Sequence, residues 1–271
     1  MMDWRSIADF AEETARAAGQ VLLDHLGKLK DIRGKSGIND LVTEADLASE
    51  DLITRRIQNR FPDHSIISEE NSVILPDSHI NWVVDPLDGT TNFVHQFPEF
   101  AVSIGVQYQN QTVAGVVFNP VFNQCFSAYL DGGAYLNGSR VKVSDTSELA
   151  TSLLLTGFPY KQDELWETNY ELFKLFYRNS HGVRRLGAAS LDLCYVAAGR
   201  FEGFWEFNLQ SWDICAGEFI LREAGGKTSD WGGGKLSQNG FRVLATNGNI
   251  HQQMIKVINQ PEFDIFRNRI G

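Results

Sequence analysis

Positions 85–93 read Asp85-Pro86-Leu87-Asp88-Gly89-Thr90-Thr91-Asn92-Phe93, and this stretch says most about both fold and chemistry. It continues the apolar run 80–85, which predicts a buried strand with Asp85 at its end. Pro86 fixes one backbone angle, so we expect a turn here rather than a strand ladder that continues through both carboxylates. Such a turn would direct the two carboxylates and the carbonyl of Leu87 to one point.

The residue types in this stretch suit a cation and an anion together. Carboxylate and carbonyl oxygens are the ligands that Mg²⁺ prefers. The glycine and threonines that follow offer backbone N–H groups and hydroxyls to an anion. The alternative is a solvated acidic turn, because Asp, Pro and Gly are all common in turns. An isolated pair of aspartates would favour that alternative, whereas the full nine-residue string is more specific.

Two further acidic elements lie far from this stretch in the sequence. Glu69 and Glu70 follow the strand-like run 64–67, and adjacent glutamates are usually a solvated surface feature. Asp213 opens a predicted helix, where an aspartate is a common cap. From the residues alone, Asp213 is better interpreted as a cap than as a ligand.

Hydrophobic periodicity outlines the rest of the chain. The first part predicts two helices followed by a largely antiparallel sheet, and the second part alternates strands and helices. Residues 35–40 are rich in turn formers. We expect helices near 4–27, 43–60, 163–178, 188–199 and 213–224 and from about 249, and strands at 80–85, 101–108, 113–119, 124–130, 151–156 and 241–246. The pattern indicates a layered arrangement of helices and strands.

The bulk composition argues against several classes of protein. Lys and Arg number 24 against 34 Asp and Glu, a formal net charge of −10, which disfavours nucleic-acid binding. No stretch approaches the ~20 apolar residues of a membrane span, and residues 1–13 do not resemble a secretory signal. The three cysteines form neither a disulfide framework nor a metal motif. We therefore expect a cytoplasmic protein with no membrane or nucleic-acid partner.

The motifs taken together resemble the inositol monophosphatase family, which belongs to the lithium-sensitive, magnesium-dependent sugar phosphatases. Beside the strand with its nine-residue string, the upstream glutamates and the later Trp212-Asp213, the likeness extends over nearly the whole chain. Further family-like stretches lie at 40–46, 92–98, 157–160, 184–189 and 198–203. The resemblance implies an α+β fold, a layered α-β-α-β-α sandwich, in one domain with α/β halves at about 1–145 and 146–271. It also implies a homodimer.

The resemblance implies a set of metal ligands. Glu69, Asp85 and the carbonyl of Leu87 would hold a first Mg²⁺, and Asp85, Asp88 and Asp213 a second. Glu69 would also contribute, through water, to a third and weaker site. Two such ions can stabilise both the attacking and the leaving oxygen of a phosphate ester and activate a water molecule for direct attack.

Catalytic and phosphate-binding roles also follow from the resemblance. Thr90 and Asp46 match the pair that orients the attacking water and takes its proton, with Glu69 beside them. The amides of Gly89 and Thr90 would hold the phosphate, and Lys35 matches a lysine near this site. Two alternatives stay open, since Asp46 falls in the first turn of a predicted helix and Lys35 could be a solvated loop residue.

For the alcohol part of the substrate, Asp88, Ala189 and Glu206 match positions that contact the inositol ring. The expected reaction is hydrolysis of a phosphomonoester, most simply myo-inositol 1-phosphate. Fructose 1,6-bisphosphate, nucleotide phosphates and histidinol phosphate are alternatives, because relatives hydrolyse them. A binding protein on the same fold, in contact with RNA polymerase or the ribosome-assembly machinery, is a further alternative.

Overall fold

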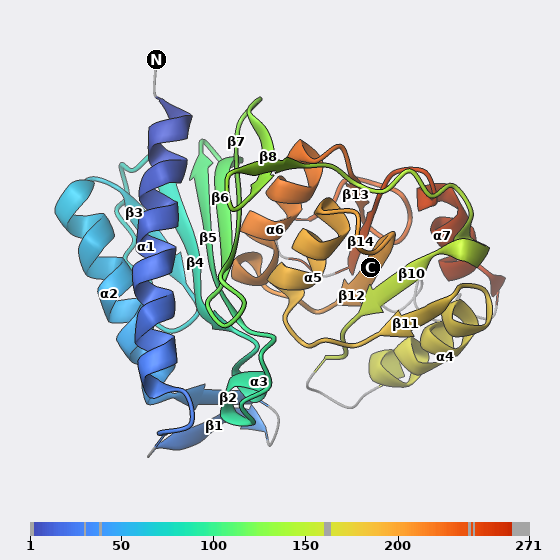
Figure 1. Ribbon diagram of the computed structural model, residues 1–271, viewed down its shortest axis with the longest axis horizontal. Coiled ribbons are helices and arrows are strands. Elements are labelled where there is room, and N and C mark those ends of the chain that lie inside the picture. Colours follow the sequence, from blue (N-terminus) through green and yellow to red (C-terminus); the bar gives the residue numbers. More distant parts are fainter. Residues whose placement is uncertain are drawn as a thin grey trace.

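Two β-sheets stacked between helices form the frame of the molecule, seen edge-on in Figure 1. The structure is a computed structural model that describes residues 3–29, 31–37, 40–159, 164–237, 240 and 242–261. The layers follow the order α-β-α-β-α, as the family resemblance implied. Among the described residues, no helix is both long and apolar enough to cross a membrane.

The first outer layer and the larger sheet come from the N-terminal part of the chain. Helices α1 (Trp4–His25) and α2 (Glu44–Arg60) cover one face of the sheet (Figure 1). The strand order is the chain order, and only the β3–β4 pair is parallel. The strands are β3 (Ser65–Ser68), β4 (Ile80–Asp88), β5 (Ala101–Tyr108), β6 (Gln111–Asn119), β7 (Gln124–Tyr129), β8 (Gly133–Leu136) and β9 (Ser139–Val141).

The second sheet and the other outer layer come from the C-terminal part. Its strand order is β11-β10-β12-β14-β13. The strands are β10 (Leu153–Thr156), β11 (Gly182–Arg184), β12 (Gly203–Phe207), β13 (Lys227–Ser229) and β14 (Arg242–Thr246). Helices α4 (Glu164–Arg178) and α7 (His251–Ile258) lie on its outer side (Figure 1). A short 3₁₀ helix at Leu149–Thr151 precedes β10.

Helix α1 packs on the large sheet through a face of small side chains. Its buried residues recur every three or four positions, which is the pattern that predicts an amphipathic helix. Gly19 on this face lies so close to β6 that a Cβ atom there would be 2.6 Å from the ring of Phe118. Asp3 caps the helix by accepting hydrogen bonds from the backbone N–H groups of Arg5 and Ser6.

The middle layer consists of α5 (Ala189–Ala197) and α6 (Ser211–Glu223), between the two sheets (Figure 1). Glycines on β5 and β6 let α6 approach the large sheet closely. A Cβ atom at Gly105 would meet the sulfur of Cys215, and one at Gly115 would lie 2.9 Å from the carbonyl of Ala216. These contacts fix the second turn of α6 against β5 and β6, and β5 pairs with β4, which carries the acidic stretch.

The sequence predicted the long helices and central strands well and several short elements poorly. The predicted helices correspond to α1, α2, α4, α5, α6 and α7. The turn expected at 35–40 falls in a hairpin of β1 (Ile32–Gly37) and β2 (Asp40–Thr43), which was not predicted. The short strands β8, β9, β11 and β13 were also missed, because three or four residues carry too little periodicity.

Candidate active site

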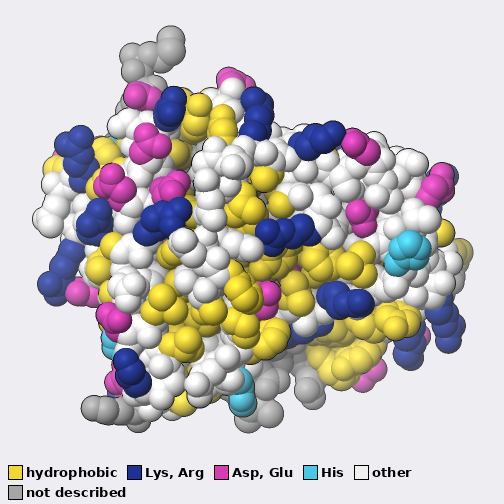
Figure 2. Space-filling view, viewed as in Figure 1, with side chains coloured by type: hydrophobic (Ala, Val, Ile, Leu, Met, Phe, Trp, Pro, Cys, Tyr) yellow, Lys and Arg dark blue, Asp and Glu magenta, His cyan; other side chains and the backbone are white. Residues whose placement is uncertain are grey.

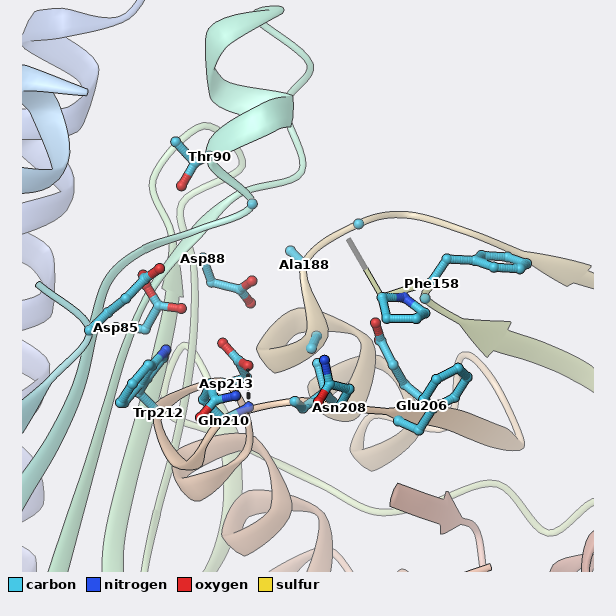
Figure 3. A pocket seen from close by; sticks show the side chains of 18 of the residues that line it. Asp85, Asp88, Thr90, Phe158, Ala188, Glu206, Asn208, Gln210, Trp212 and Asp213 are labelled. Carbon is cyan, nitrogen blue, oxygen red and sulfur yellow. Dashed lines mark hydrogen bonds between the residues drawn. The ribbon is translucent and has the colours of Figure 1, made fainter. Parts of the chain in front are cut away.

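A pocket of about 400 Å³ opens between the two halves of the molecule, and its walls come from both (Figure 3). One wall carries Asp85, Asp88 and Asp213, and Glu206 stands on the opposite side. The volume is within the usual range for small-molecule sites. The sequence predicted these four carboxylates from distant segments, and the fold brings them to one cavity.

The acidic stretch forms a β-bulge in place of the expected turn. Strand β4 continues through Asp88, and its register with β5 shifts between the pairs Asp85–Ser103 and Asp88–Ala101. A bulge leaves an extra residue outside the ladder, so Pro86 can be accommodated although it has no N–H to donate. The expectation that the ladder would stop at Asp85 was therefore wrong. The Leu87 N–H donates to the Asp85 carboxylate at 3.0 Å, which fixes the bend.

Strand β3 places Glu69 beside this bulge. Ser68 pairs with Val84 in the parallel β3–β4 ladder, and Glu69 follows it directly and lines the pocket. The segment after β3 is held by Glu50 of α2, a buried residue. Its carboxylate accepts from the Ser68 hydroxyl at 2.5 Å and from Asn71 at 2.7 Å. This role of Glu50 was not predicted from the sequence, since a single acid in a helix carries no signal of a distant partner.

Asp46 caps helix α2, as its place in the first turn predicted, and it also contacts Thr90. One carboxylate oxygen accepts from the backbone N–H and hydroxyl of Thr43 at 2.8 and 2.6 Å, which caps α2. The other oxygen accepts from the Thr90 hydroxyl at 3.2 Å, and that hydroxyl also lies 3.0 Å from the carbonyl of Leu87. Burial raises the pKa of Asp46, while the hydrogen bonds from Thr43 lower it. Thr90 lines the pocket, so Asp46 reaches the cavity through Thr90.

Asp88 and Asp213 are each hydrogen-bonded to the start of a helix. The Asp88 carboxylate accepts from the Ser190 N–H at 2.8 Å and from its hydroxyl at 2.5 Å, at the first turn of α5. Burial raises the pKa of Asp88 to about 6, although these bonds act in the opposite direction. Asp213 accepts from the Gln210 N–H at 2.7 Å, so it caps α6 and lines the pocket at once.

The carboxylates are close enough to perturb one another. Burial raises the pKa of Asp85 well above its usual value, and the charges of Glu69, Asp88 and Asp213 raise it further. Among the described residues, no three acidic, histidine or cysteine side chains are arranged to hold a metal ion as they stand. Asp88 and Asp213 are directed to protein N–H and O–H donors. A buried group of mutually repelling oxygen donors nevertheless has the chemistry that a divalent cation requires.

The opposite wall of the pocket contains one buried carboxyl group, Glu206, among small residues. Glu206 of β12 is buried, and burial raises its pKa to about 8, with Arg185 lowering it and Asp213 and Asp88 raising it. Gly157 lies against this carboxylate, because a Cβ atom at Gly157 would overlap the Glu206 oxygens. Ala189, expected from the resemblance, lines the same cavity. A carboxylate held among such neighbours can accept hydrogen bonds from hydroxyl groups.

Three pocket features were not predicted. Arg185, Ser190 and Trp212 contribute to the site or its hydrogen bonds, and the only signal was their position inside or next to family-like stretches. Of the predicted residues, Gly89 lines the pocket at the left-handed start of α3 (Thr90–Val94). The side chain of Lys35 lies outside what the structure describes.

Comparison with known proteins gives a consistent result. A family model described as the inositol monophosphatase family matches residues 3–261. An inositol-1-monophosphatase of Synechocystis sp. is 41% identical over 257 residues, covering 94% of this chain and 90% of the relative. A Nus factor SuhB of Pasteurella multocida is 39% identical over 261 residues, covering 96% of this chain and 98% of the relative.

Solved structures agree with the sequence relatives. The structure of an inositol monophosphatase from Anabaena (Nostoc) sp. superposes with a TM-score of 0.84 at 41% identity. It covers 94% of this chain and 95% of the Anabaena chain. The likeness therefore includes both sheets and all the helix layers between and around them.

Proposed function

We propose a substrate and a mechanism for this chain on the basis that it belongs to the inositol monophosphatase family and is a phosphomonoester hydrolase. The proposed reaction is hydrolysis of the phosphate ester of a small polyol, with myo-inositol 1-phosphate as the first candidate. One observation carries the proposal: a group of buried carboxylates faces Glu206 across a single pocket of about 400 Å³. One wall suits the phosphate with its counter-ions, and the other suits hydroxyl groups.

The family is metal-dependent, and for this chain we propose two or three Mg²⁺ ions. Glu69, Asp85 and the carbonyl of Leu87 would hold one ion, and Asp85, Asp88 and Asp213 another. The support is the raised pKa of Asp85 among its acidic neighbours, since cations would remove that repulsion. When bound, such ions would neutralise phosphate charge and lower the pKa of a water molecule, so that it could lose a proton and attack near neutral pH.

Thr90 and Asp46 are proposed to accept the proton of the attacking water. The Thr90 hydroxyl can accept a hydrogen bond from water while it donates to the Asp46 carboxylate at 3.2 Å. The raised pKa of Asp46 makes it a stronger base than an exposed aspartate. In this scheme the proton passes from water through Thr90 to Asp46, and the amides of Gly89 and Thr90 orient the phosphate.

Glu206 and Ala189 are proposed to recognise the alcohol part of the substrate. The Glu206 carboxylate would accept hydrogen bonds from vicinal hydroxyls, and the small Ala189 side chain leaves room for the ring. Lys35 keeps its expected place near the phosphate as part of the proposal.

A comparison of esters tests the choice of substrate. The kcat/KM values for myo-inositol 1-phosphate, fructose 1,6-bisphosphate, a nucleoside monophosphate and histidinol phosphate should be measured with the same protein preparation. The proposal expects the inositol ester to rank first. A higher kcat/KM for any other ester would make that ester the preferred substrate and leave the proposed metal-dependent mechanism unchanged.

We also propose a homodimer in the cytoplasm. Figure 2 shows hydrophobic side chains gathered over the middle of one face, near the turn between β6 and β7 of Figure 1. Phe97, Val121 and Phe122 are among the exposed large hydrophobic residues, with 47%, 37% and 50% of their surface accessible. An exposed apolar patch of this kind supports an interface between copies. Light scattering on wild type and Phe122→Glu tests it, with a monomer expected for the variant.

A regulatory role is the second candidate function, because the 39% identical relative of Pasteurella multocida is named a Nus factor. We propose that any such role of this chain depends on its surface rather than on hydrolysis. An affinity capture of the transcription machinery with Asp85→Asn would test this. Capture equal to that of the wild-type protein is expected, and capture by neither protein would exclude the role.

A further inference from the structure

Helix α6 separates the active-site pocket from a second cavity. Its first turn lines the active-site pocket with Trp212 and Asp213. Ser211, Cys215 and Arg222 line a separate cavity of about 520 Å³. These three positions are spaced by four and seven residues, so they share one helix face. The other walls come from the β5–β6 end of the large sheet, from β13 and from the segment before β14 (Figure 1).

The second cavity contains a polar side chain with a weak partner. Gln107 of β5 is only 8% exposed, and its amide nitrogen donates to the Cys215 sulfur at 3.6 Å. Thr112 of β6 also contacts this sulfur at 3.6 Å. A thiol is a poor hydrogen-bond partner, and burial raises its pKa to about 11. A ligand hydroxyl would be a better partner for both side chains than the thiol.

The charges on the cavity wall favour an anion. Glu218 is neutralised, since it forms an ion pair with Arg222 at 2.8 Å and accepts from the Thr228 hydroxyl at 2.7 Å. Lys235 also lines the cavity, and it makes no ion pair within the described part of the chain. Within the described part of the chain, the wall therefore carries one positive charge without an ion-pair partner, together with amide and hydroxyl side chains.

We propose that this cavity is a second ligand site, for a small polyhydroxylated organic anion, and that its occupant acts on the active site through α6. The volume of about 520 Å³ accommodates a molecule of sugar size. The ligand carries several hydroxyls for Gln107 and Thr112 and one acidic group, a carboxylate or a phosphate, for Lys235. This inference goes beyond the proposed hydrolysis and uses none of its residues as ligands.

Close packing provides the coupling between the two cavities. The first turn of α6 lies against β5, where the Ser103 hydroxyl donates to the Trp212 carbonyl at 3.4 Å and Gly105 contacts Cys215. A helix packed this tightly moves as a unit, because its neighbours leave no room for one side chain to shift alone. Displacing Cys215 from one side therefore displaces Asp213 on the other side.

Binding of two probes tests the site. D-gluconate supplies a carboxylate, and a non-hydrolysable sugar phosphonate supplies a phosphate-like group that the enzyme cannot cleave. Calorimetry on the full chain should give saturable binding of at least one probe, retained when inorganic phosphate saturates the active site. The probe that binds identifies the acidic group, and saturable binding of neither would overturn the proposal whether or not the protein hydrolyses esters.

Variants locate the bound probe. Lys235→Glu should weaken binding by about fivefold, as expected for an exposed charge pair. Gln111→Trp, at the exposed start of β6 on the cavity wall, should abolish binding by filling the space. Lys256→Glu is the matched control, since it makes the same charge change at an exposed residue of α7 that does not line the cavity. Equal binding by all three variants would overturn the assignment.

The coupling is tested by linkage. If the bound probe changes the Mg²⁺ concentration that gives half-maximal hydrolysis, Mg²⁺ must change the dissociation constant of the probe by the same factor when both report equilibrium binding. A shared factor that disappears in Gln111→Trp supports the effector site. Binding of the probe with no effect on the metal dependence would overturn the proposed action through α6.

Discussion

Glu206 is a buried carboxyl whose protonation couples the pocket to pH. Its pKa is raised to about 8 from the ordinary glutamate value of 4.5, chiefly by burial. Between these two values the folded protein holds a proton that the unfolded chain has lost. Stability is therefore highest below about pH 4.5 as far as this group is concerned, and it falls as pH rises toward 8.

Glu206→Gln should remove this contribution. We expect the variant to be more stable than wild type at pH 8 and to show a shallower decrease of stability between pH 5 and pH 8. Chemical denaturation without added metal at several pH values measures the difference. Glu148→Gln, at an exposed position, is the control and should follow wild type. Parallel curves for wild type and Glu206→Gln would contradict the buried-carboxyl account.

Gly157 gives a separate test of substrate recognition. In Gly157→Ala the new methyl group would overlap the Glu206 carboxylate and displace it. The KM for myo-inositol 1-phosphate should rise about tenfold, because losing a hydrogen bond to a buried polar group costs about 1–3 kcal/mol. Hydrolysis of 4-nitrophenyl phosphate, which has no vicinal hydroxyls, should change much less. An equal loss for both esters would mean that the substitution disturbs the phosphate side.

At the scale of single residues, the sequence predicted the acidic side chains of the pocket and missed their supports. Asp85, Asp88 and Asp213 lie in recognisable motifs, so their shared location was expected. Glu50 and Ser190 hold the site through contacts between segments far apart in the chain. Such contacts depend on the packing of α2 and α5 and leave no local pattern.

The element that determines the geometry of the site is the bulge at the end of β4, followed by Gly89. Gly89 has a φ of +88°, and a Cβ atom there would lie 2.8 Å from the carbonyl of Glu99. Left-handed backbone costs a non-glycine residue about 1–2 kcal/mol before any contact is counted. A glycine is therefore favoured at position 89 for two reasons: the left-handed backbone conformation and the close approach of the Glu99 carbonyl.

Gly89→Ala should consequently destabilise the fold by more than the backbone cost alone, over about 2 kcal/mol. Gly138→Ala is the matched control, because Gly138 has a φ of +77° but a Cβ atom added there would have nothing within 4 Å. The free energy of unfolding from urea denaturation compares the two. Equal losses in both variants would show that the contact with Glu99 is unimportant.

At the scale of elements, the sequence was right about long periodic segments and wrong about the acidic stretch. A proline between two aspartates predicts a turn by its backbone preference. The chain instead forms a bulge. Pro86 lies in this bulge, where no hydrogen bond of the ladder requires its N–H group. Pairing with β5 therefore overrode the local preference, and the tertiary partner was not visible in the local sequence.

The whole molecule is expected to unfold as one unit, and we propose that the halves 1–145 and 146–271 form a single domain. One core cluster extends across the middle layer, because it includes Val117 of the large sheet, Phe219 of α6 and Val243 of the second sheet. Loss of either sheet would expose apolar surface of α6 to water.

Coincident unfolding curves would support this proposal. Tryptophan fluorescence reports on Trp82 in the large sheet and Trp205 in the second sheet, and far-UV circular dichroism reports on the whole backbone. Urea denaturation should give the same midpoint with both probes. Two separated transitions would show that the halves are independent domains.

If the carboxylates of the pocket hold cations for the hydrolysis of a polyol phosphate, phosphate release from myo-inositol 1-phosphate must depend on both the cations and the carboxylates. Wild type, Asp85→Asn and the exposed control Asp9→Asn should be assayed with Mg²⁺ and with excess chelator. Turnover should require Mg²⁺, fall by at least about a hundredfold in Asp85→Asn, and keep the wild-type rate in Asp9→Asn. Turnover that persists in the chelator, or in Asp85→Asn at the wild-type rate, would contradict this dependence.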